Sequence, residues 1–268
     1  MVSVSEGGGY LLDNQMAGAG QRLEALSELF DPVTRRHVGA LGITQGWRCW
    51  EVGAGGPSIA AWLADQVGRS GRVLATDIDL TWLRGDQRFD VVQHDVGAQP
   101  APATGFDLIH ARLVLVHVRQ RDEALRTMVG ALRPGGWLLL EDADPGLQPL
   151  LCPDESGPEE ALANGLREGF RSLMRDRGAD LAFGRTLPRR LREAGLIDVR
   201  ADAYFPIASP ACVSLEQATI EQVRSLLVER GLASEAQVER HLENIAAGTM
   251  DLATSPLISA WGRRDWRA

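Results

Sequence analysis

Apolar positions near the N-terminus recur every three or four residues between Ala17 and about Leu41, which is the spacing of one helix face. In the first half of this stretch they are Leu23, Leu26, Leu29 and Phe30. Asp31 and Pro32 interrupt the pattern, because a proline cannot donate the hydrogen bond that a helix interior needs. The pattern therefore predicts two helices that meet at Asp31-Pro32, with the proline in the first turn of the second.

From residue 48 the pattern changes to short apolar runs that alternate with helical stretches. Strands are expected at 48–52, 71–77, 89–95, 106–111 and 137–142, and helices at 58–67 and 121–136. The connection over 78–88 is short and leaves room for one or two helical turns. Strands that alternate with helices are typical of an open, mostly parallel sheet with helices on both faces.

The alternation stops after Asp144, where a loop rich in proline and glycine follows. The remaining pattern predicts helices at 159–178, 186–196, 214–231 and 234–248, and strands at 198–208 and 255–264. These two strands bring the sheet to seven, so we expect an α/β, doubly wound, mostly parallel seven-stranded sheet. Three parts are expected along the chain: an N-terminal helical segment (1–46), a core (47–144), and cap helices with C-terminal strands that complete the sheet (145–268).

Composition excludes several classes of partner. The 268 residues are 44% hydrophobic and carry a net charge of −8, and no apolar run reaches the roughly 20 residues that span a bilayer. The first 15 residues lack the basic and apolar regions of a secretory signal. A negative chain without a basic run is a poor match for nucleic-acid phosphates. We therefore expect a cytoplasmic protein with neither a membrane nor a nucleic-acid partner.

Three residue types narrow the chemistry further. Cys49, Cys152 and Cys212 share no metal-binding spacing and are expected to be buried thiols rather than disulfides or zinc ligands. Histidines and carboxylates show no ligand spacing either, so no metal site is expected. The chain contains no lysine, which excludes a phosphate-binding P-loop lysine, a Schiff base and a Tyr-x-x-x-Lys pair. The same lack is typical of a GC-rich coding sequence, and on that ground we expect a role in secondary metabolism.

The densest cluster of small residues is WEVGAGGPS at 50–58. Glu51 closes a predicted strand and Ser58 opens a predicted helix. The backbone between them must turn sharply and let a ligand approach, which favours residues without bulky side chains. The free N–H groups at the start of the helix would face that ligand. A dinucleotide fingerprint needs glycine where Ser58 stands, so the motif departs from that of nicotinamide enzymes.

Two carboxylates follow at the ends of the next predicted strands. Asp77 lies 24 residues after Gly53 and Asp95 ends the third strand. A carboxylate at the first position can accept hydrogen bonds from both hydroxyls of a ribose. With Glu51 and the glycine turn, and with FDLIHARLVLVHV and ALRPGGWLLLED further on, this order resembles the class I S-adenosylmethionine (SAM)-dependent methyltransferases. The resemblance covers about residues 40–144 and is strongest to the small-molecule and menaquinone-biosynthesis types.

The resemblance implies a Rossmann-like methyltransferase fold, SAM as the cofactor and S-adenosylhomocysteine as its product. By position, it assigns cofactor binding to Glu51, Gly53, Ala54, Gly55, Asp77, Ile78, Asp95, Val96, His110, Ala111 and Arg112. Asp95 is expected at the adenine amino group and His110 beside the methionine end. Arg112 is expected either at a carboxylate of SAM or substrate, or in an ion pair with Asp107 or Asp142.

Methyl transfer needs a nucleophile held in line with the methyl and at most one proton acceptor. The predicted catalytic residues are His117 and Glu141, with His110 and His37 as further candidates for a base. A packing role for His117 is left open. The predicted substrate contacts are Asp142, Asp144, Phe170 and Tyr204. The acceptor is expected to be a small molecule with an oxygen, nitrogen or carbon nucleophile.

Two other functions remain open from the sequence. A SAM-binding protein that performs no methyl transfer, such as a sensor or an enzyme of the pericyclase kind, would keep the same cofactor motif. A nicotinamide-dependent oxidoreductase is disfavoured by Glu51, by Ser58 and by the missing lysine. The amphipathic N-terminal helices could pair two chains into a homodimer or close over the site of one chain.

Overall fold

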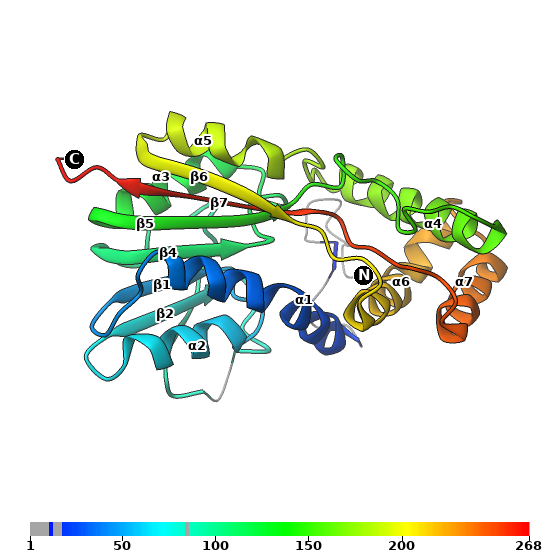
Figure 1. Cartoon of the computed structure of the whole chain (residues 1–268), viewed down its shortest axis with the longest axis horizontal. Helices are drawn as coiled ribbons and strands as arrows, with labels where there is room; N and C mark the ends of the chain where they lie inside the picture. The colour runs from blue at the N-terminus through cyan, green and yellow to red at the C-terminus, as the bar shows by residue number, and fades with distance from the viewer. Residues whose placement is uncertain (1–10, 13–17, 84–85, 268) are drawn as a thin grey trace, which may run out of the picture.

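The computed structural model describes residues 11–12, 18–83 and 86–267, which form one layered α/β body (Figure 1). A seven-stranded sheet runs through it in the order β3-β2-β1-β4-β5-β7-β6. Its strands are β1 (Arg48–Val52), β2 (Arg72–Asp77), β3 (Asp90–Gln93), β4 (Phe106–Arg112), β5 (Leu132–Ala143), β6 (Leu196–Tyr204) and β7 (Leu257–Arg264). β7 runs antiparallel to β5 and β6, and the other neighbours are parallel. The predicted fold class is confirmed.

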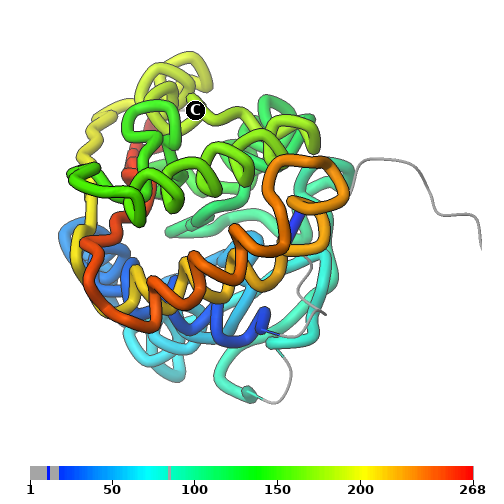
Figure 2. The backbone as a smooth tube through the Cα atoms, turned by 90° about the vertical axis from the view of Figure 1, so that its right-hand side faces the viewer, coloured from blue at the N-terminus to red at the C-terminus, as the bar shows by residue number. Residues whose placement is uncertain are grey.

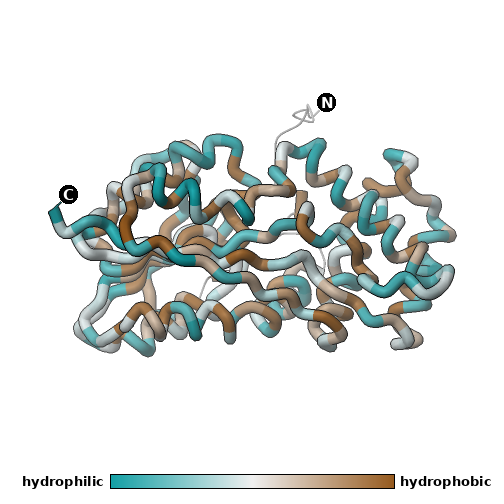
Figure 3. Tube along the Cα trace, turned by 45° about the horizontal axis from the view of Figure 1, so that its top comes forward, coloured by the Kyte–Doolittle hydropathy of each residue, from teal (hydrophilic) through white to brown (hydrophobic). Residues whose placement is uncertain are grey.

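Helices cover both faces of the sheet. One face packs against α1 (Ala19–Ala40) and α2 (Ser58–Val67), and the other against α3 (Arg121–Ala131) and α5 (Leu187–Glu193), which follows the short 3-10 helix η1 (Gly184–Thr186). Alternate strand residues supply the two cores, since successive side chains of a strand point to opposite faces. Trp50 lies in one core and Cys49 in the other. The apolar segments run through the centre, with hydrophilic helix surface outside (Figure 3).

The cap consists of α4 (Pro158–Asp176), α6 (Pro210–Glu229) and α7 (Glu235–Ala247). These helices share their own apolar core, to which Phe170, Ile220 and Val238 contribute. They stand beyond the carboxyl ends of the parallel strands (Figure 1), with α4 on one side and α6 and α7 on the other in the end-on view (Figure 2). In an open parallel sheet this edge is where ligands bind. The exact division into three parts stays a prediction.

The N-terminal helix differs from the expected pair of helices, because α1 continues through Pro32 without a break. Proline in a helix interior removes one hydrogen bond and costs about 3 kcal/mol in isolation. Tertiary contacts hold the helix together here. The neighbouring Asp31 accepts from Arg112 Nη2 at 2.8 Å, and Val33 is buried. The predicted start at Ala17 and most of the first 15 residues lie outside the described residues.

Three other boundaries differ from the predicted ones. β5 begins directly after α3, so Pro134-Gly135-Gly136 lies within the strand and does not end the helix. A Cβ on Gly136 would approach the carbonyl oxygen of Phe106 at 2.7 Å, which explains its place beside β4. The described residues of the 78–88 connection form a turn and no helix. α6 begins at Pro210, four residues before its predicted start, because proline suits the first helical turn.

The three cysteines are buried free thiols, as expected. Burial raises the pKa of the Cys152 thiol to about 12, which keeps it protonated and unreactive. No helix in the described part of the chain is both long and apolar enough to cross a membrane.

Candidate active site

A cavity of about 530 Å³ lies between the carboxyl ends of β1, β2 and β4 and the cap helices α4 and α6. Its volume is in the range of small-molecule and cofactor sites. The glycine turn after β1 forms one wall, and one face of α4 forms another. The residues predicted for the site that line it are Glu51, Gly53, Ala54, Gly55, Asp77, Ile78, Asp95, Val96, Arg112, His117 and Phe170.

The glycine turn is built for close approach. Gly53 and Gly55 both have a φ of 61°, a left-handed conformation that side chains rarely adopt. A Cβ on Gly53 would collide with Val114, and one on Gly55 would meet Leu23 of α1 at 3.1 Å. Space next to Gly56 is open. The turn therefore needs glycine at two positions for its own packing, and it presents bare backbone to the cavity.

Asp77 ends β2 and holds the glycine turn. Its carboxylate accepts from the backbone N–H of Gly55 at 2.8 Å and from that of Asp79 at 2.9 Å. The residue is only 6% exposed, and this burial raises the pKa of the carboxyl although the two backbone donors oppose it. Each carboxylate oxygen has two lone pairs. Both oxygens can therefore still accept hydrogen bonds from a ligand, which fits the predicted contact with a ribose.

Apolar and polar groups flank the far end of the turn. Ile78 is 55% exposed and Val96 is buried, and both line the cavity. Asp95, beside Val96, accepts from the backbone N–H of Gly97 at 2.8 Å and remains exposed. Two aliphatic side chains next to a carboxylate suit a flat heterocycle with an amino group. The set therefore fits the adenosine part of SAM.

Glu51 links the cavity to a buried histidine. Its Oε2 accepts from His110 Nδ1 at 2.7 Å, and His110 Nε2 donates to Glu141 Oε2 at 3.2 Å. Burial alone would lower the pKa of His110, but the two carboxylates outweigh it and raise the pKa to about 9. His110 is therefore a cation that neutralises both acids. It lies behind Glu51 and, with Ala111, does not line the cavity, which corrects the expected place of both beside the methionine end.

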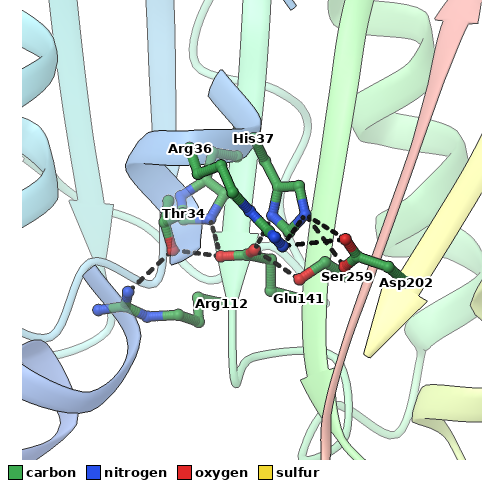
Figure 4. Close-up of polar contacts among 8 residues, drawn as sticks. Thr34, Arg36, His37, Arg112, Glu141, Asp202 and Ser259 are labelled. Carbon is green, nitrogen blue, oxygen red and sulfur yellow. Dashed lines mark hydrogen bonds and ion pairs between the residues drawn. The ribbon is translucent and has the colours of Figure 1, made fainter. Parts of the chain in front are cut away.

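Glu141 is the centre of the polar cluster in Figure 4. It accepts from Ser259 Oγ at 2.7 Å, from His37 Nδ1 at 3.1 Å and from Thr34 Oγ1. These donors and His110 hold the pKa of Glu141 below its usual range, although burial would raise it. The carboxylate is fully buried and lies off the cavity wall. Glu141 is thus not placed to take a proton from a substrate, contrary to its predicted catalytic role.

The cluster continues to the molecular surface. His37 of α1 contacts Asp202 of β6 at 3.0 Å through Nε2, and Arg36 donates to Asp202 at 2.9 Å. Burial lowers the pKa of His37, but the flanking carboxylates outweigh this and raise it. The His37 side chain is buried between α1 and the sheet and is absent from the cavity lining. Hydrogen bonds and ion pairs therefore connect alternating acids and histidines from the cavity to the edge of the sheet, in the order Glu51, His110, Glu141, His37 and Asp202.

Arg112, at the end of β4, lines the cavity, and residues of α1 hold its guanidinium in place. Its guanidinium donates to Asp31 Oδ1 at 2.8 Å and to Thr34 Oγ1 at 2.9 Å. Its ion-pair partner is thus Asp31 and not either of the two acids considered from the sequence. Because a guanidinium has five N–H donors, Arg112 keeps capacity for a ligand carboxylate.

His117 follows β4 in a turn closed by its own backbone N–H, which donates to Val114 O at 3.0 Å. The residue lines the cavity. Burial, together with the positive charges of Arg22 and Arg121, lowers its pKa to about 4. The imidazole is therefore neutral at physiological pH and can accept a hydrogen bond.

Three predicted substrate contacts lie away from the cavity. Asp142 is 1% exposed, its carboxylate is held by the backbone N–H groups of Leu115 and Val116, and burial raises its pKa to about 8. Asp144 accepts from Arg185 Nε at 2.8 Å. Tyr204 packs edge-on against Phe30, with ring centroids 6.3 Å apart, and Phe30 lines the cavity instead. Each of these three side chains contacts a partner elsewhere in the fold, which a linear pattern does not reveal.

Several lining residues were missed from the sequence. Five of them are arginines: Arg22, Arg119, Arg167, Arg171 and Arg177. Arg167 and Arg171 belong to α4 and Arg177 is its C-cap, and the three recur with Phe170 and Met174 at helical spacing. That spacing was a usable signal, because it predicts a helix face on which basic and apolar side chains alternate. Among the described residues no group of three or more potential ligands could hold a metal ion.

Comparison with known proteins agrees with this geometry. Residues 50–140 match the family model of a methyltransferase domain. The chain is 31% identical over 116 residues to the ubiquinone/menaquinone biosynthesis C-methyltransferase UbiE of Pseudoalteromonas translucida, covering 40% of this chain and 46% of that protein. It is 34% identical over 120 residues to the same enzyme of Serratia proteamaculans, covering 41% and 48%. The chain thus spans about half the length of these curated relatives.

Solved structures share the fold at low sequence identity. The YcgJ protein of Bacillus subtilis superposes with a TM-score of 0.54 at 13% identity, covering 86% of this chain and 97% of that one. Phosphoethanolamine N-methyltransferase 2 of Haemonchus contortus, in complex with phosphomonomethylethanolamine and S-adenosylhomocysteine, gives 0.52 at 15% identity, covering 92% and 52%. The family model, the sheet order and the carboxylates at the strand ends agree. Residues 50–140 therefore form a SAM-dependent methyltransferase domain, and the chain as a whole has the class I methyltransferase fold.

Proposed function

We propose that this protein transfers a methyl group from SAM to an oxygen, nitrogen or carbon nucleophile of a small molecule. The observation that carries the proposal is the cavity at the strand ends, where a bare glycine turn meets Glu51, Asp77 and Asp95. The chain's arginine-only basic composition keeps a secondary metabolite as our expectation for the acceptor.

SAM supplies, when bound, a methyl carbon activated by a sulfonium and a good leaving group. Asp77 is suited to accept from the ribose hydroxyls, and Ile78 and Val96 to pack on the adenine. Glu51 offers a carboxylate to the amino group of the methionine part. His110 orients that carboxylate, since it donates to Glu51 at 2.7 Å. Arg112 has donors left for the cofactor carboxylate.

The acceptor would occupy the part of the cavity under α4. His117 is the one predicted catalytic residue on the wall, and its neutral ring can accept a hydrogen bond from an acceptor O–H or N–H. A group with a pKa near 4 is a weak base at neutral pH. We therefore assign His117 to orienting the nucleophile, with any full proton transfer going to solvent after the methyl has moved.

The test is transfer of label from methyl-tritiated SAM by the purified protein. A panel of phenols, amines and β-dicarbonyl compounds is offered, and products are identified by a mass gain of one methylene. We expect at least one class to be methylated, and Asp77→Ala to abolish turnover. Asp79→Ala is the matched control, because Asp79 stands two residues away and is not on the cavity wall. SAM binding without methylation of any acceptor class would instead favour a protein that uses the cofactor without transfer.

A further inference from the structure

One face of α4 presents alternating cationic and apolar side chains to the cavity. Arg167, Phe170, Arg171 and Met174 line it, and so does Arg177 at the C-cap of the helix. They recur at intervals of three and four residues, which places them on one side of the helix. The stems of the first two arginines are packed away, because the side chains of Arg167 and Arg171 are only 14% and 16% exposed. Their guanidinium groups are thus part of the cavity wall and not of the outer surface.

Charge in the cavity is divided between its two ends. The carboxylates that line it are Glu51, Asp77 and Asp95, and all three belong to the carboxyl ends of the strands. Within the described residues the cap contributes arginines to the wall and no carboxylate. The wall under α4 therefore favours an anionic group, whereas the strand ends combine carboxylates with Arg112.

The arginines of α4 are anchored but not saturated. Arg167 donates to Glu216 at 2.7 Å, and Arg171 donates from Nη1 to Glu168 at 2.6 Å. Each guanidinium has five donors, and Nε of Arg171 is buried without a hydrogen-bond partner among the described residues. A buried donor left unpaired costs free energy. A ligand oxygen at this position would remove that cost.

The carboxylate of SAM does not require the arginines of α4. SAM has one carboxylate, and Arg112 stands at the end of β4 beside the glycine turn to receive it. Arg22 belongs to the start of α1, next to Leu23, which packs on the same turn. The arginines of α4 come from the opposite wall and have no partner in the cofactor as assigned above.

We propose that the methyl acceptor carries an anionic group, a carboxylate or a phosphate, which Arg171 and Arg167 bind while Phe170 and Met174 contact its apolar part. The inference rests on the proposed function, since it assigns the acceptor end of the same cavity. A bidentate arginine contact fits either anion. The apolar side chains between the arginines require that the anion be attached to a hydrophobic body.

The experiment compares two fluorescent probes that differ in one charged group. 8-Anilinonaphthalene-1-sulfonate has the ring system of N-phenyl-1-naphthylamine plus a sulfonate. Both are titrated into the full chain in the presence of saturating S-adenosylhomocysteine. We expect the sulfonate probe to bind at least tenfold more tightly. 3-Phenylpropionate and phenyl phosphate then compete with it, and the stronger competitor identifies the anion, whereas the neutral 3-phenylpropanamide should compete weakly.

Arg171→Gln and Arg175→Gln form a matched pair of variants. Both arginines donate to Glu168, at 2.6 Å each, but only Arg171 lines the cavity. We expect Arg171→Gln to weaken the sulfonate probe about tenfold and to leave the neutral probe unchanged, while Arg175→Gln alters neither. Equal binding of the two probes by the unmodified protein would overturn the proposal, and this comparison needs no variant.

Equal effects of the two substitutions would also overturn the proposal. Binding of S-adenosylhomocysteine is measured on the same samples by calorimetry. Its absence would contradict the proposed function, whereas loss of the preference for the anionic probe with the cofactor still bound would contradict only the assignment of the acceptor.

Discussion

Raising the pH should destabilise this protein through His110, which is fully buried between Glu51 and Glu141. The pKa of His110 is about 9 in the folded chain, against an ordinary value of 6.5. One pH unit of difference is worth about 1.4 kcal/mol, so the protonated imidazole contributes roughly 3 kcal/mol. Because the folded pKa is the higher one, this stabilisation is complete below pH 6.5 and is lost as the pH rises through 9.

Urea unfolding of the unmodified protein between pH 6.5 and 9.5 measures the effect. His110→Gln leaves two buried carboxylates without their shared cation, so we expect it to lose about 3–5 kcal/mol at pH 6.5. The difference from the unmodified protein should shrink toward pH 9.5, where His110 itself is neutral. A difference that stays constant over this range would refute the assignment of a protonated imidazole.

Ser259→Ala is the control within the same cluster. It removes a hydrogen bond of 2.7 Å to Glu141 but no titrating group. We expect a loss of about 1 kcal/mol that is the same at both ends of the pH range.

Three further predictions concern the cavity and its surroundings. Gly53→Ala should lower the free energy of unfolding by about 1–3 kcal/mol and weaken the binding of S-adenosylhomocysteine measured by calorimetry. The reason is that a φ of 61° is strained for alanine and the added Cβ would collide with Val114. Unchanged affinity would contradict the close-approach role. Glu51→Gln should weaken S-adenosylhomocysteine at least tenfold by removing a charged acceptor for the amino group; a smaller loss would argue against that contact. Asp142→Asn should stabilise the protein by at least about 1 kcal/mol at pH 8 and by less at pH 5. Burial raises the pKa of Asp142 to about 8, so the folded state holds a proton that the unfolded state releases near pH 4. If urea unfolding at pH 8 shows equal stability, the buried carboxylate is tolerated and the reasoning is wrong.

The sequence predicted the fold because local signals and topology agreed over the core. The strand at Arg48–Val52 and the helix at Ser58–Val67 have the bounds that the hydrophobic pattern indicated. The break expected at Pro32 was wrong for a reason that local propensity does not contain. Contacts from Arg112 and the buried face of α1 hold the helix across the proline.

For the site, the positions at strand ends were the predictable part. Asp77 and Asp95 reach one cavity because parallel strands place their carboxyl ends at a common edge. Sequence position alone could not distinguish these cavity residues from others near the strand ends whose side chains are buried behind the cavity wall. His110 and Glu141 stand on strands of the same sheet, but their side chains bond to each other and to α1 and β7.

The cap was the least predictable part of the site. Tyr204 and Phe30 lie far apart in the chain and pack together, so that only Phe30 faces the cavity. The arginines of α4 carried a periodic signal, but the sequence did not show which side of that helix would face the strand ends. The assembled cap resolves this, with Arg171 inside and Arg175 outside the cavity lining.

The central claim is that the strand ends bind SAM through the glycine turn and Asp77. Calorimetric titration with S-adenosylhomocysteine, with NADH as the control ligand, tests it most directly. We predict micromolar binding of S-adenosylhomocysteine, no binding of NADH, and a loss of at least tenfold on Asp77→Ala that Asp79→Ala does not reproduce. Binding of NADH in its place, or an unchanged affinity in Asp77→Ala, would contradict the account.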